Sequence, residues 1–204
     1  MQVTERARSA TAEARRTQIE KTTIEVIADE GLRQATFARI AARAELSSTR
    51  LISYHYSSKE ELIGAVAQRV VSAIGTAVGA RVRAETSAAS QLRVYIEAVV
   101  RFTSEQRTAM QALLAIALGG GLPPALSADL AEPSHVEAIL RRGQAAGEFR
   151  DFDPWTMALT VQRALEALPF VLAFRPDLDC DAFAHELVTL FALATQPAAD
   201  GSGR

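Results

Sequence analysis

The feature that most constrains this chain is that apolar residues recur at helical spacing along its whole length. No run of alternating β-branched residues bounded by Asn-Gly or Asp-Gly turns occurs, whereas Ala, Leu, Arg and Glu dominate. Hydrophobic residues make up 49% and charged residues 23% of the sequence, as in ordinary globular proteins. The sequence therefore predicts a folded, all-α protein.

Local capping signals divide the first sixty residues into three helices. Residues 11–30 place apolar side chains on one face and stop at a glycine, the residue type best suited to the left-handed position after a helix. Thr36 is a suitable N-cap for a second, short helix, and Ser47 or Ser48 for a third. The third helix is expected to run through the aromatic cluster at 54–56.

The remainder of the chain is also expected to be helical. Ser58 and Glu61 match a capping box that opens a long helix, and Asp153-Pro154 pairs an N-cap with proline at the first helical position. The expected helices are 58–84, 92–118 with a bend near 104–107, 134–146, 154–174 with a kink or break at Pro169, and 180–195 after an Asp179 cap. The tail 196–204 is expected to be disordered.

Several functional classes lack the residues that they require. The single cysteine, Cys180, forms no internal disulfide, and three scattered histidines give no metal-ligand spacing. No catalytic or phosphate-loop motif occurs, and polar residues or proline interrupt the apolar segments. We therefore expect a soluble cytoplasmic protein with no catalytic residue, metal site, cofactor or membrane partner.

The stretch from Ser47 to Lys59, which holds no Asp or Glu, carries the strongest functional signal. Two short helices joined by a turn and supported by a third form the unit that presents a helix to the DNA major groove. A helix that reads DNA carries small hydrogen-bonding and basic side chains. The polar candidates here are Ser47, Ser48, Thr49, Arg50, Ser53, Tyr54, His55 and Lys59. The pattern predicts a DNA-binding helix-turn-helix.

Two phrases flank the turn and the third helix: Ala35-Thr36-Phe37-Ala38-Arg39-Ile40-Ala41-Ala42-Arg43-Ala44 and Ser53-Tyr54-His55-Tyr56-Ser57-Ser58-Lys59-Glu60-Glu61-Leu62. With them, residues 15–66 resemble the N-terminal domain of the TetR/AcrR family of regulators. The resemblance implies an all-α homodimer in which a three-helix DNA-binding domain precedes a larger ligand-binding and dimerisation domain. It also implies a repressor that a small molecule releases from double-stranded operator DNA.

Three departures from the family pattern affect the turn and the third helix. Glu45 replaces the usual turn glycine, Tyr56 replaces the usual phenylalanine, and the stretch between Ala44 and Tyr56 is one residue longer than in common members. Counting forward from Ala44 makes Ser47 the helix cap, whereas counting back from Tyr56 makes it Ser48. The two registers assign different side chains to the bases, and both stay open at this point.

The resemblance implies a role for individual side chains. Thr36 and Lys59 are expected to hold phosphates, and Tyr54 and His55 to contact the backbone or nearby bases. Thr49 and Arg50 are the best candidates for reading bases. Phe37, Ile52 and Tyr56 are expected in the core, while Arg15 and Arg16 either reach a phosphate or lie on a solvated helix face.

Beyond the first domain the resemblance is mainly architectural. We expect a DNA-binding domain at 1–57 and a ligand-binding and dimerisation domain at 58–204, joined by the helix at 58–84. The last two helices, about 154–174 and 180–195, are expected to pair with their copies in a homodimer. Phe102, Met110 and Trp155 are candidates to line the site of an unidentified small-molecule effector, with ordinary core packing as the alternative. Two rival classes are an all-helical enzyme and a helical interaction or ligand-binding module that does not bind DNA.

Overall fold

Every regular element of the described chain is a helix, which confirms the all-α prediction. The computed structural model describes residues 2–197, with side chains from residue 10 onward, and it contains no strand over that range. Residues 198–204, most of the tail that was expected to be disordered, lie outside the described residues.

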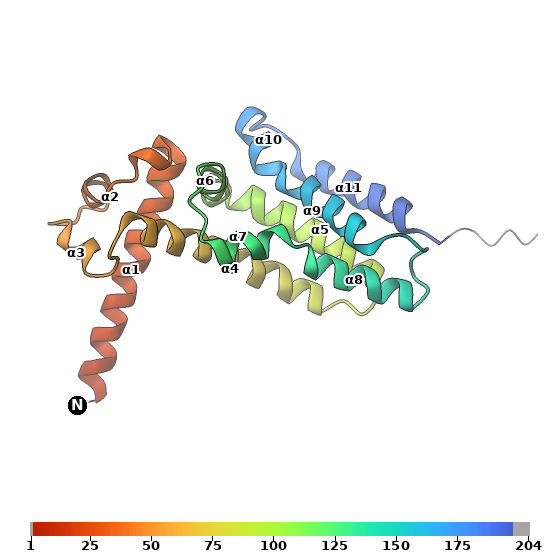
Figure 1. Cartoon of the computed structure of the whole chain (residues 1–204), viewed down its shortest axis with the longest axis horizontal. Coiled ribbons are helices and arrows are strands. Elements are labelled where there is room, and N and C mark those ends of the chain that lie inside the picture. The colour runs from red at the N-terminus through yellow and green to blue at the C-terminus, as the bar shows by residue number, and fades with distance from the viewer. Residues whose placement is uncertain (1, 198–204) are drawn as a thin grey trace, which may run out of the picture. The chain divides into compact units, whose positions relative to one another are not determined.

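The chain divides into two compact units, and the first comprises residues 1–71 and 108–126. Its elements are α1 (Gln2–Glu30), the 3₁₀ turn η1 (Leu32–Gln34), α2 (Phe37–Arg43), α3 (Arg50–Ser53), the first half of α4 (Lys59–Arg83) and nearly all of α6 (Arg107–Leu118) (Figure 1). Helix α1 packs against both η1 and α2. Buried Ile19, Val26 and Ile27 of α1, Ile40 of α2 and Ile52 of α3 supply apolar core to this unit.

The helix ends of the first unit follow the capping signals of the sequence. Gly31 adopts φ +92° after α1, and the Thr36 hydroxyl accepts a hydrogen bond from the Arg39 backbone N–H at the start of α2. The Ser58 hydroxyl accepts from the Glu61 N–H at 3.1 Å, while the Glu61 carboxylate accepts from the backbone N–H one residue before Ser58, at 2.6 Å. These contacts confirm the predicted caps of α2 and α4.

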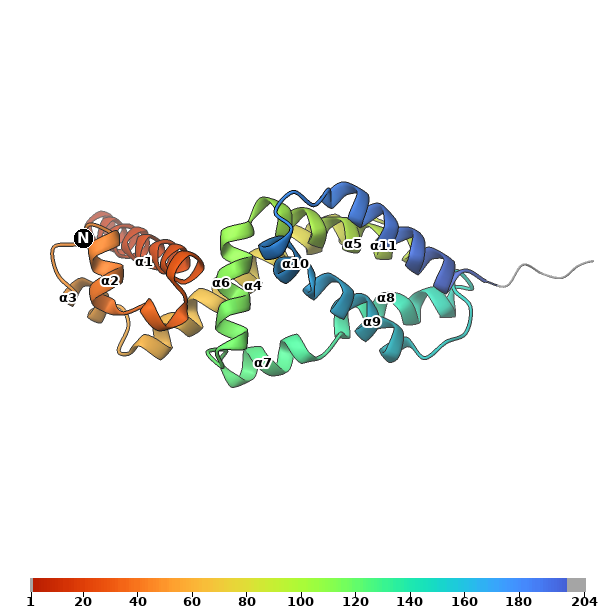
Figure 2. The ribbon, with the colours of Figure 1, turned by 90° about the horizontal axis from the view of Figure 1, so that it is seen from above.

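The second unit comprises residues 72–107 and 127–204. Its elements are the end of α4, α5 (Ala88–Glu105), most of α7 (Pro124–Ala131), α8 (Ser134–Ala145), α9 (Pro154–Glu166), α10 (Leu168–Phe174) and α11 (Cys180–Thr195). Helix α5 packs against α8, α9 and α11, as Figure 2 shows for α11. Their apolar faces meet in one core that includes Leu92, Ile96, Leu140, Val161 and Phe191.

Several boundaries differ from the sequence predictions, beginning with α1, which starts at Gln2 and not at residue 11. Helix α5 begins at Ala88 because the Ser87 hydroxyl caps it through the Ser90 N–H, so the expected break at 87–90 is only a cap. The predicted bend at 104–107 is a complete break at Gln106, and the predicted break near Pro169 occurs at Ala167. Helix α7 was not predicted at all.

The first unit extends beyond residue 57 because the segment after α6 packs closely against the N-terminal helices. A Cβ atom on Gly119 would lie 2.5 Å from Leu32 Cδ2, and one on Gly64 would lie 3.0 Å from Pro123 Cγ. The boundary predicted between a DNA-binding and a ligand-binding domain is a functional one, and it stays a prediction.

Two helical stretches, Lys59–Arg83 and Pro154–Phe174, are long and apolar enough to cross a membrane by length and composition alone. The polar residues and prolines in these segments therefore do not exclude a membrane-spanning length. Core helices of soluble proteins also pass the test, and α4 buries Leu62, Val66 and Val70. The finding is weak support for a membrane protein.

Candidate DNA-binding site

The polar, acid-free side of α3 faces outward. Ile52 is fully buried and Tyr56 is 1% exposed, whereas Thr49, Arg50 and Ser53 are exposed and Tyr54 is 82% exposed. The helix therefore uses its apolar residues to pack on the first unit and leaves its hydrogen-bonding side chains free to meet a ligand. The core positions predicted for Ile52 and Tyr56 are confirmed, while Phe37 is half-buried.

Of the two serines, Ser48 and not Ser47 hydrogen-bonds the start of α3, whose N-cap residue is Thr49 with no capping bond from its own side chain. The Ser48 hydroxyl accepts a hydrogen bond from the Arg50 backbone N–H at 3.1 Å, and the Ser48 carbonyl accepts from the Leu51 N–H. Ser47 is exposed in the turn between α2 and α3. Regular α3 ends at Ser53, earlier than predicted, and single turns continue the chain to Tyr56.

Helix α2 ends in a motif that ordinarily requires glycine. The Leu46 N–H donates to the Ala41 carbonyl and the Glu45 N–H to the Ala42 carbonyl, which is the Schellman arrangement. Glu45 occupies the left-handed position of this motif, with φ +53°. A side chain with a Cβ is strained there, so the replacement of the usual turn glycine carries an energetic cost.

We expect the Glu45→Gly variant to be more stable than the parent protein by about 0.5–1 kcal/mol, because relief of the left-handed strain exceeds the entropy that glycine adds to the unfolded chain. Glu45→Ala keeps the strain and should show no comparable gain. Chemical denaturation of the three proteins measures the difference. A lower free energy of unfolding for Glu45→Gly would contradict this account of the turn.

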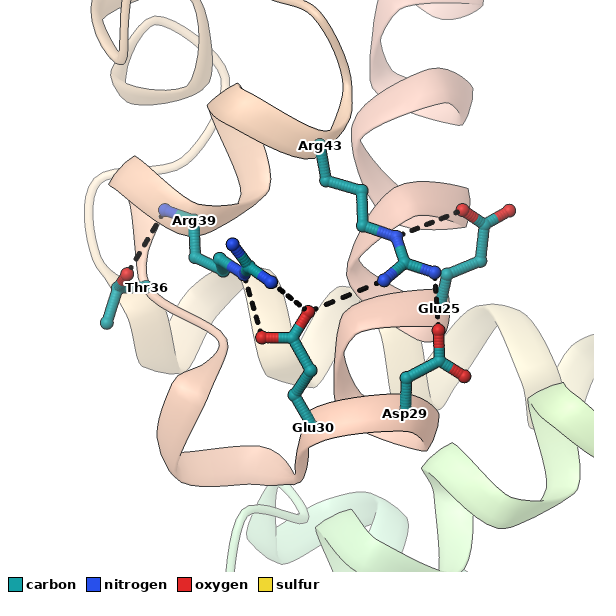
Figure 3. A network of polar contacts seen from close by, with 6 residues as sticks. All are labelled: Glu25, Asp29, Glu30, Thr36, Arg39 and Arg43. Carbon is teal, nitrogen blue, oxygen red and sulfur yellow. Dashed lines mark hydrogen bonds and ion pairs between the residues drawn. The ribbon is translucent and has the colours of Figure 1, made fainter.

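Two arginines on α2 are committed to ion pairs with the end of α1 (Figure 3). The Arg39 guanidinium donates to both oxygens of Glu30, at 2.7 and 2.8 Å. Arg43 bonds Asp29 and lies 3.4 Å from a Glu30 oxygen and 3.9 Å from a Glu25 oxygen. The Arg39 bond, opposed in part by desolvation, holds the pKa of the Glu30 carboxyl below its usual range. These charges fix α2 against α1 and are not the predicted phosphate contacts.

The structure gives the predicted phosphate-binding residues structural contacts as well. Thr36 is exposed, and its hydroxyl caps α2. The Lys59 ammonium donates to the Leu32 and Arg33 carbonyls at 3.0 and 3.2 Å, which uses two of its three N–H groups. Tyr54 and His55 rings meet edge to face, with centroids 5.1 Å apart.

A buried polar contact that no sequence motif predicted lies behind α3. The Tyr56 hydroxyl donates to Glu20 of α1, and Arg69 of α4 bonds the other oxygen of that carboxylate. The presence of tyrosine where the family usually has phenylalanine was the available signal, because a buried hydroxyl needs a partner. Tyr56 and Arg69 lie 36 and 49 residues from Glu20 in the chain, so no local sequence pattern contains these contacts.

The three residues proposed to line a ligand site lie on three different helices. Phe102 on α5 and Met110 on α6 are half-buried and belong to different compact units. Trp155, in the first turn of α9, is 44% exposed. Within the part of the chain that the structure describes, no cluster of three metal-ligating side chains occurs.

The last three helices expose large apolar side chains. Phe170 and Phe174 of α10 are 53% and 72% exposed, with ring centroids 4.9 Å apart. Leu190 and Leu193 of α11 are 61% and 68% exposed and share a helix face because they are three residues apart. Exposed apolar groups of this size mark interaction surfaces.

Comparison with known sequences supports the N-terminal assignment. Residues 19–66 match the family model of bacterial regulatory proteins of the tetR family. The chain is also 29% identical over 174 residues to the HTH-type transcriptional regulator BetI of Ectopseudomonas mendocina (strain ymp), covering 84% of this chain and 86% of that protein.

Solved structures share the fold over nearly the whole chain. A bacterial regulatory protein in the tetR family from Rhodococcus RHA1 matches with a TM-score of 0.78 and 22% identity, covering 91% of this chain and 98% of the other. AibR in complex with isovaleryl coenzyme A and operator DNA matches with a TM-score of 0.74 and 18% identity, covering 86% and 97%. At these identities the likeness establishes the fold.

Proposed function

We propose that the chain is a dimeric repressor of the TetR family of bacterial regulatory proteins, which binds operator DNA through α2 and α3 and is released by a small molecule. The observation that carries the proposal is the outward, acid-free side of α3, with Ile52 and Tyr56 buried on the opposite side. An all-helical enzyme would need a set of catalytic residues, and a regulator does not. Its place of action is the cytoplasm, where the DNA lies.

Reading of the bases is assigned to the first turn of α3. Thr49 and Arg50 are exposed at the start of α3, where the Ser48 hydroxyl accepts from the Arg50 N–H, and Ser53 lies one turn further on. A helix enters the major groove with its N-terminal residues on the base edges, and arginine makes a bidentate contact with guanine. Arg50 is therefore the leading specificity residue.

Phosphate contacts are assigned to residues on both sides of α3. The exposed hydroxyls of Thr36, Ser47 and Tyr54 can donate to phosphate oxygens, as can the third N–H of Lys59. The His55 ring meets the Tyr54 ring edge to face and can extend this contact. Such contacts set the orientation of the protein on the duplex and carry little sequence information themselves.

The dimer is assigned to the exposed apolar side chains of α9, α10 and α11. A two-fold pair of these helices would bury Phe174, Leu190 and Leu193 against their copies. The paired α3 helices would then meet half-sites about 34–36 Å apart, or at another spacing that the groove permits. The small molecule acts by binding more tightly to the state in which this spacing is lost.

The ligand site is assigned to the helices beyond the DNA-binding region, with Phe102, Met110 and Trp155 as its first candidates. AibR was solved with isovaleryl coenzyme A and operator DNA together, which makes release by an organic effector a reasonable model for this chain. Which compound acts here is a question for a ligand screen.

A DNA titration tests the proposal. Fluorescence anisotropy on the DNA upstream of the chain's own gene should give an affinity well above that for an unrelated duplex. We expect Arg50→Ala to lower the affinity for the preferred duplex about tenfold, the value of one lost base contact. Arg81→Ala, in the exposed last turn of α4, removes the same charge and should leave the affinity unchanged.

Equal affinity for all duplexes would overturn the proposal. The rival interaction module predicts instead a protein complex that is stable at high salt and free of nucleic acid, because phosphate contacts weaken steeply as salt rises.

A further inference from the structure

A buried carboxylate lies behind the exposed side of α3. Glu20 of α1 is 6% exposed, and it is the one charged side chain found buried among the residues that the structure describes. A carboxylate in that position is costly unless charged or hydrogen-bonding partners compensate for its lost hydration. Its partners therefore hold it in one arrangement.

One oxygen of Glu20 is bound by the residue that ends the α3 region. The Tyr56 hydroxyl donates to Glu20 Oε1 at 2.5 Å, and the tyrosine side chain is 1% exposed. The Arg16 guanidinium lies over the Tyr56 ring, 5.6 Å from its centroid. Burial, and then the bond to Glu20, raise the pKa of the Tyr56 phenol, so the hydroxyl keeps its proton and remains a donor.

The other oxygen of Glu20 is bound by α4. Arg69 donates to Glu20 Oε2 at 2.9 Å, and its side chain is 43% exposed. A single carboxylate on α1 thus joins the turn that follows α3 to α4, with one oxygen bound by each. Movement of α4 that broke the Arg69 bond would leave Glu20 with one hydrogen-bonding partner and a second, desolvated oxygen.

We propose that Glu20 is a positioning residue for DNA reading, which holds α3 in its reading orientation through Tyr56 and makes that orientation depend on α4 through Arg69. The inference rests on the proposed function, because it assigns α3 to the DNA. Neither Glu20 nor Arg69 needs to touch the nucleic acid.

The contact predicts a defined pattern of DNA affinities. Tyr56→Phe and Arg69→Gln should each lower the affinity for the preferred duplex about fivefold, the effect of losing one hydrogen bond to a charged or buried group. Affinity for an unrelated duplex should not change, because phosphate contacts survive a small rotation of α3. The double variant should lose little more than either single variant, because both act through one carboxylate.

Matched variants separate positioning from general damage. Tyr95→Phe in α5 and Arg81→Gln in α4 make the same chemical changes elsewhere and should leave both affinities unchanged. Arg69→Lys keeps the charge and should restore part of the specific affinity. If Tyr56→Phe does not fold, the DNA affinities of Arg69→Gln and Arg69→Lys still test the proposal, because Arg69 is half-exposed.

The outcomes distinguish the two proposals. A parent protein that binds all duplexes equally would remove the proposed function itself. Suppose instead that the parent protein clearly prefers one duplex. The positioning role alone is then overturned if Tyr56→Phe and Arg69→Gln keep that preference, or if they lose affinity for the preferred and the unrelated duplex alike. Strictly additive losses in the double variant would also overturn the role, because they would mean that the two residues act separately.

Discussion

Replacement of Leu193 by glutamate is expected to separate the dimer and to lower operator affinity about a hundredfold or more, since a monomer engages one half-site only. Leu193 is 68% exposed in one chain and shares its helix face with Leu190. In a two-fold interface the substitution occurs twice, so two carboxylates are buried near one another without partners. Sedimentation velocity and DNA anisotropy on the same samples measure both effects.

A matched control exists on another helix. Leu118, the last residue of α6, is 77% exposed, and Leu118→Glu makes the same change at a site outside α9, α10 and α11. That variant should remain dimeric and should bind DNA as the parent does. A Leu193→Glu protein that stays dimeric at micromolar concentration would show that the chain pairs through another surface.

The starts of four helices were predictable, because each depends on one or two local hydrogen bonds from a capping side chain. The hydroxyls of Thr36 and Ser58 and the carboxylate of Asp153 each cap the helix that the sequence predicted. Asp179 likewise accepts from two backbone N–H groups at the start of α11. In each case the capping residue and the N–H that it satisfies lie within three positions, so a short sequence window contains the whole interaction.

Helix α7 was not predicted because it begins among residues that favour helix ends. Glycines occupy 119–121, after the last residue of α6, and prolines occupy 123 and 124. In the structure Pro124 is the first residue of α7, where its fixed φ and missing N–H are compatible with a helix. The eight-residue length of α7 leaves too little periodicity to reveal it.

The site was predictable in composition but not in geometry. The absence of acids from Ser47 to Lys59 identified the outward face, since that property depends on residue type alone. The register depended on which serine hydroxyl meets the Arg50 N–H, and the two candidates are adjacent in the chain. Two contacts join residues more than 25 positions apart: that of Lys59 with two carbonyls, and that of Glu20 with Tyr56 and Arg69. They could be identified only from the three-dimensional structure.

Gly143→Ala should be among the most destabilising small substitutions in this chain, lowering the free energy of unfolding by about 2–3 kcal/mol. Gly143 is buried in α8, and a Cβ atom there would lie 2.1 and 2.3 Å from two carbons of the Phe149 ring. That ring is 6% exposed in the core of the second unit, and the Phe149 N–H also bonds the Gly143 carbonyl, so the ring has little freedom to move. Urea unfolding followed by circular dichroism measures the loss.

The same substitution at Gly75 is expected to have the opposite sign. Gly75 lies within α4, and a Cβ atom added there meets nothing within 4 Å. Alanine is favoured over glycine inside a helix, so Gly75→Ala should raise the free energy of unfolding by about 0.5–1 kcal/mol. Because both changes add one methyl group to a helix, their difference isolates the packing of Phe149 on Gly143. Equal effects at the two positions would mean that the second unit repacks around the added carbon and that Phe149 is not held in place.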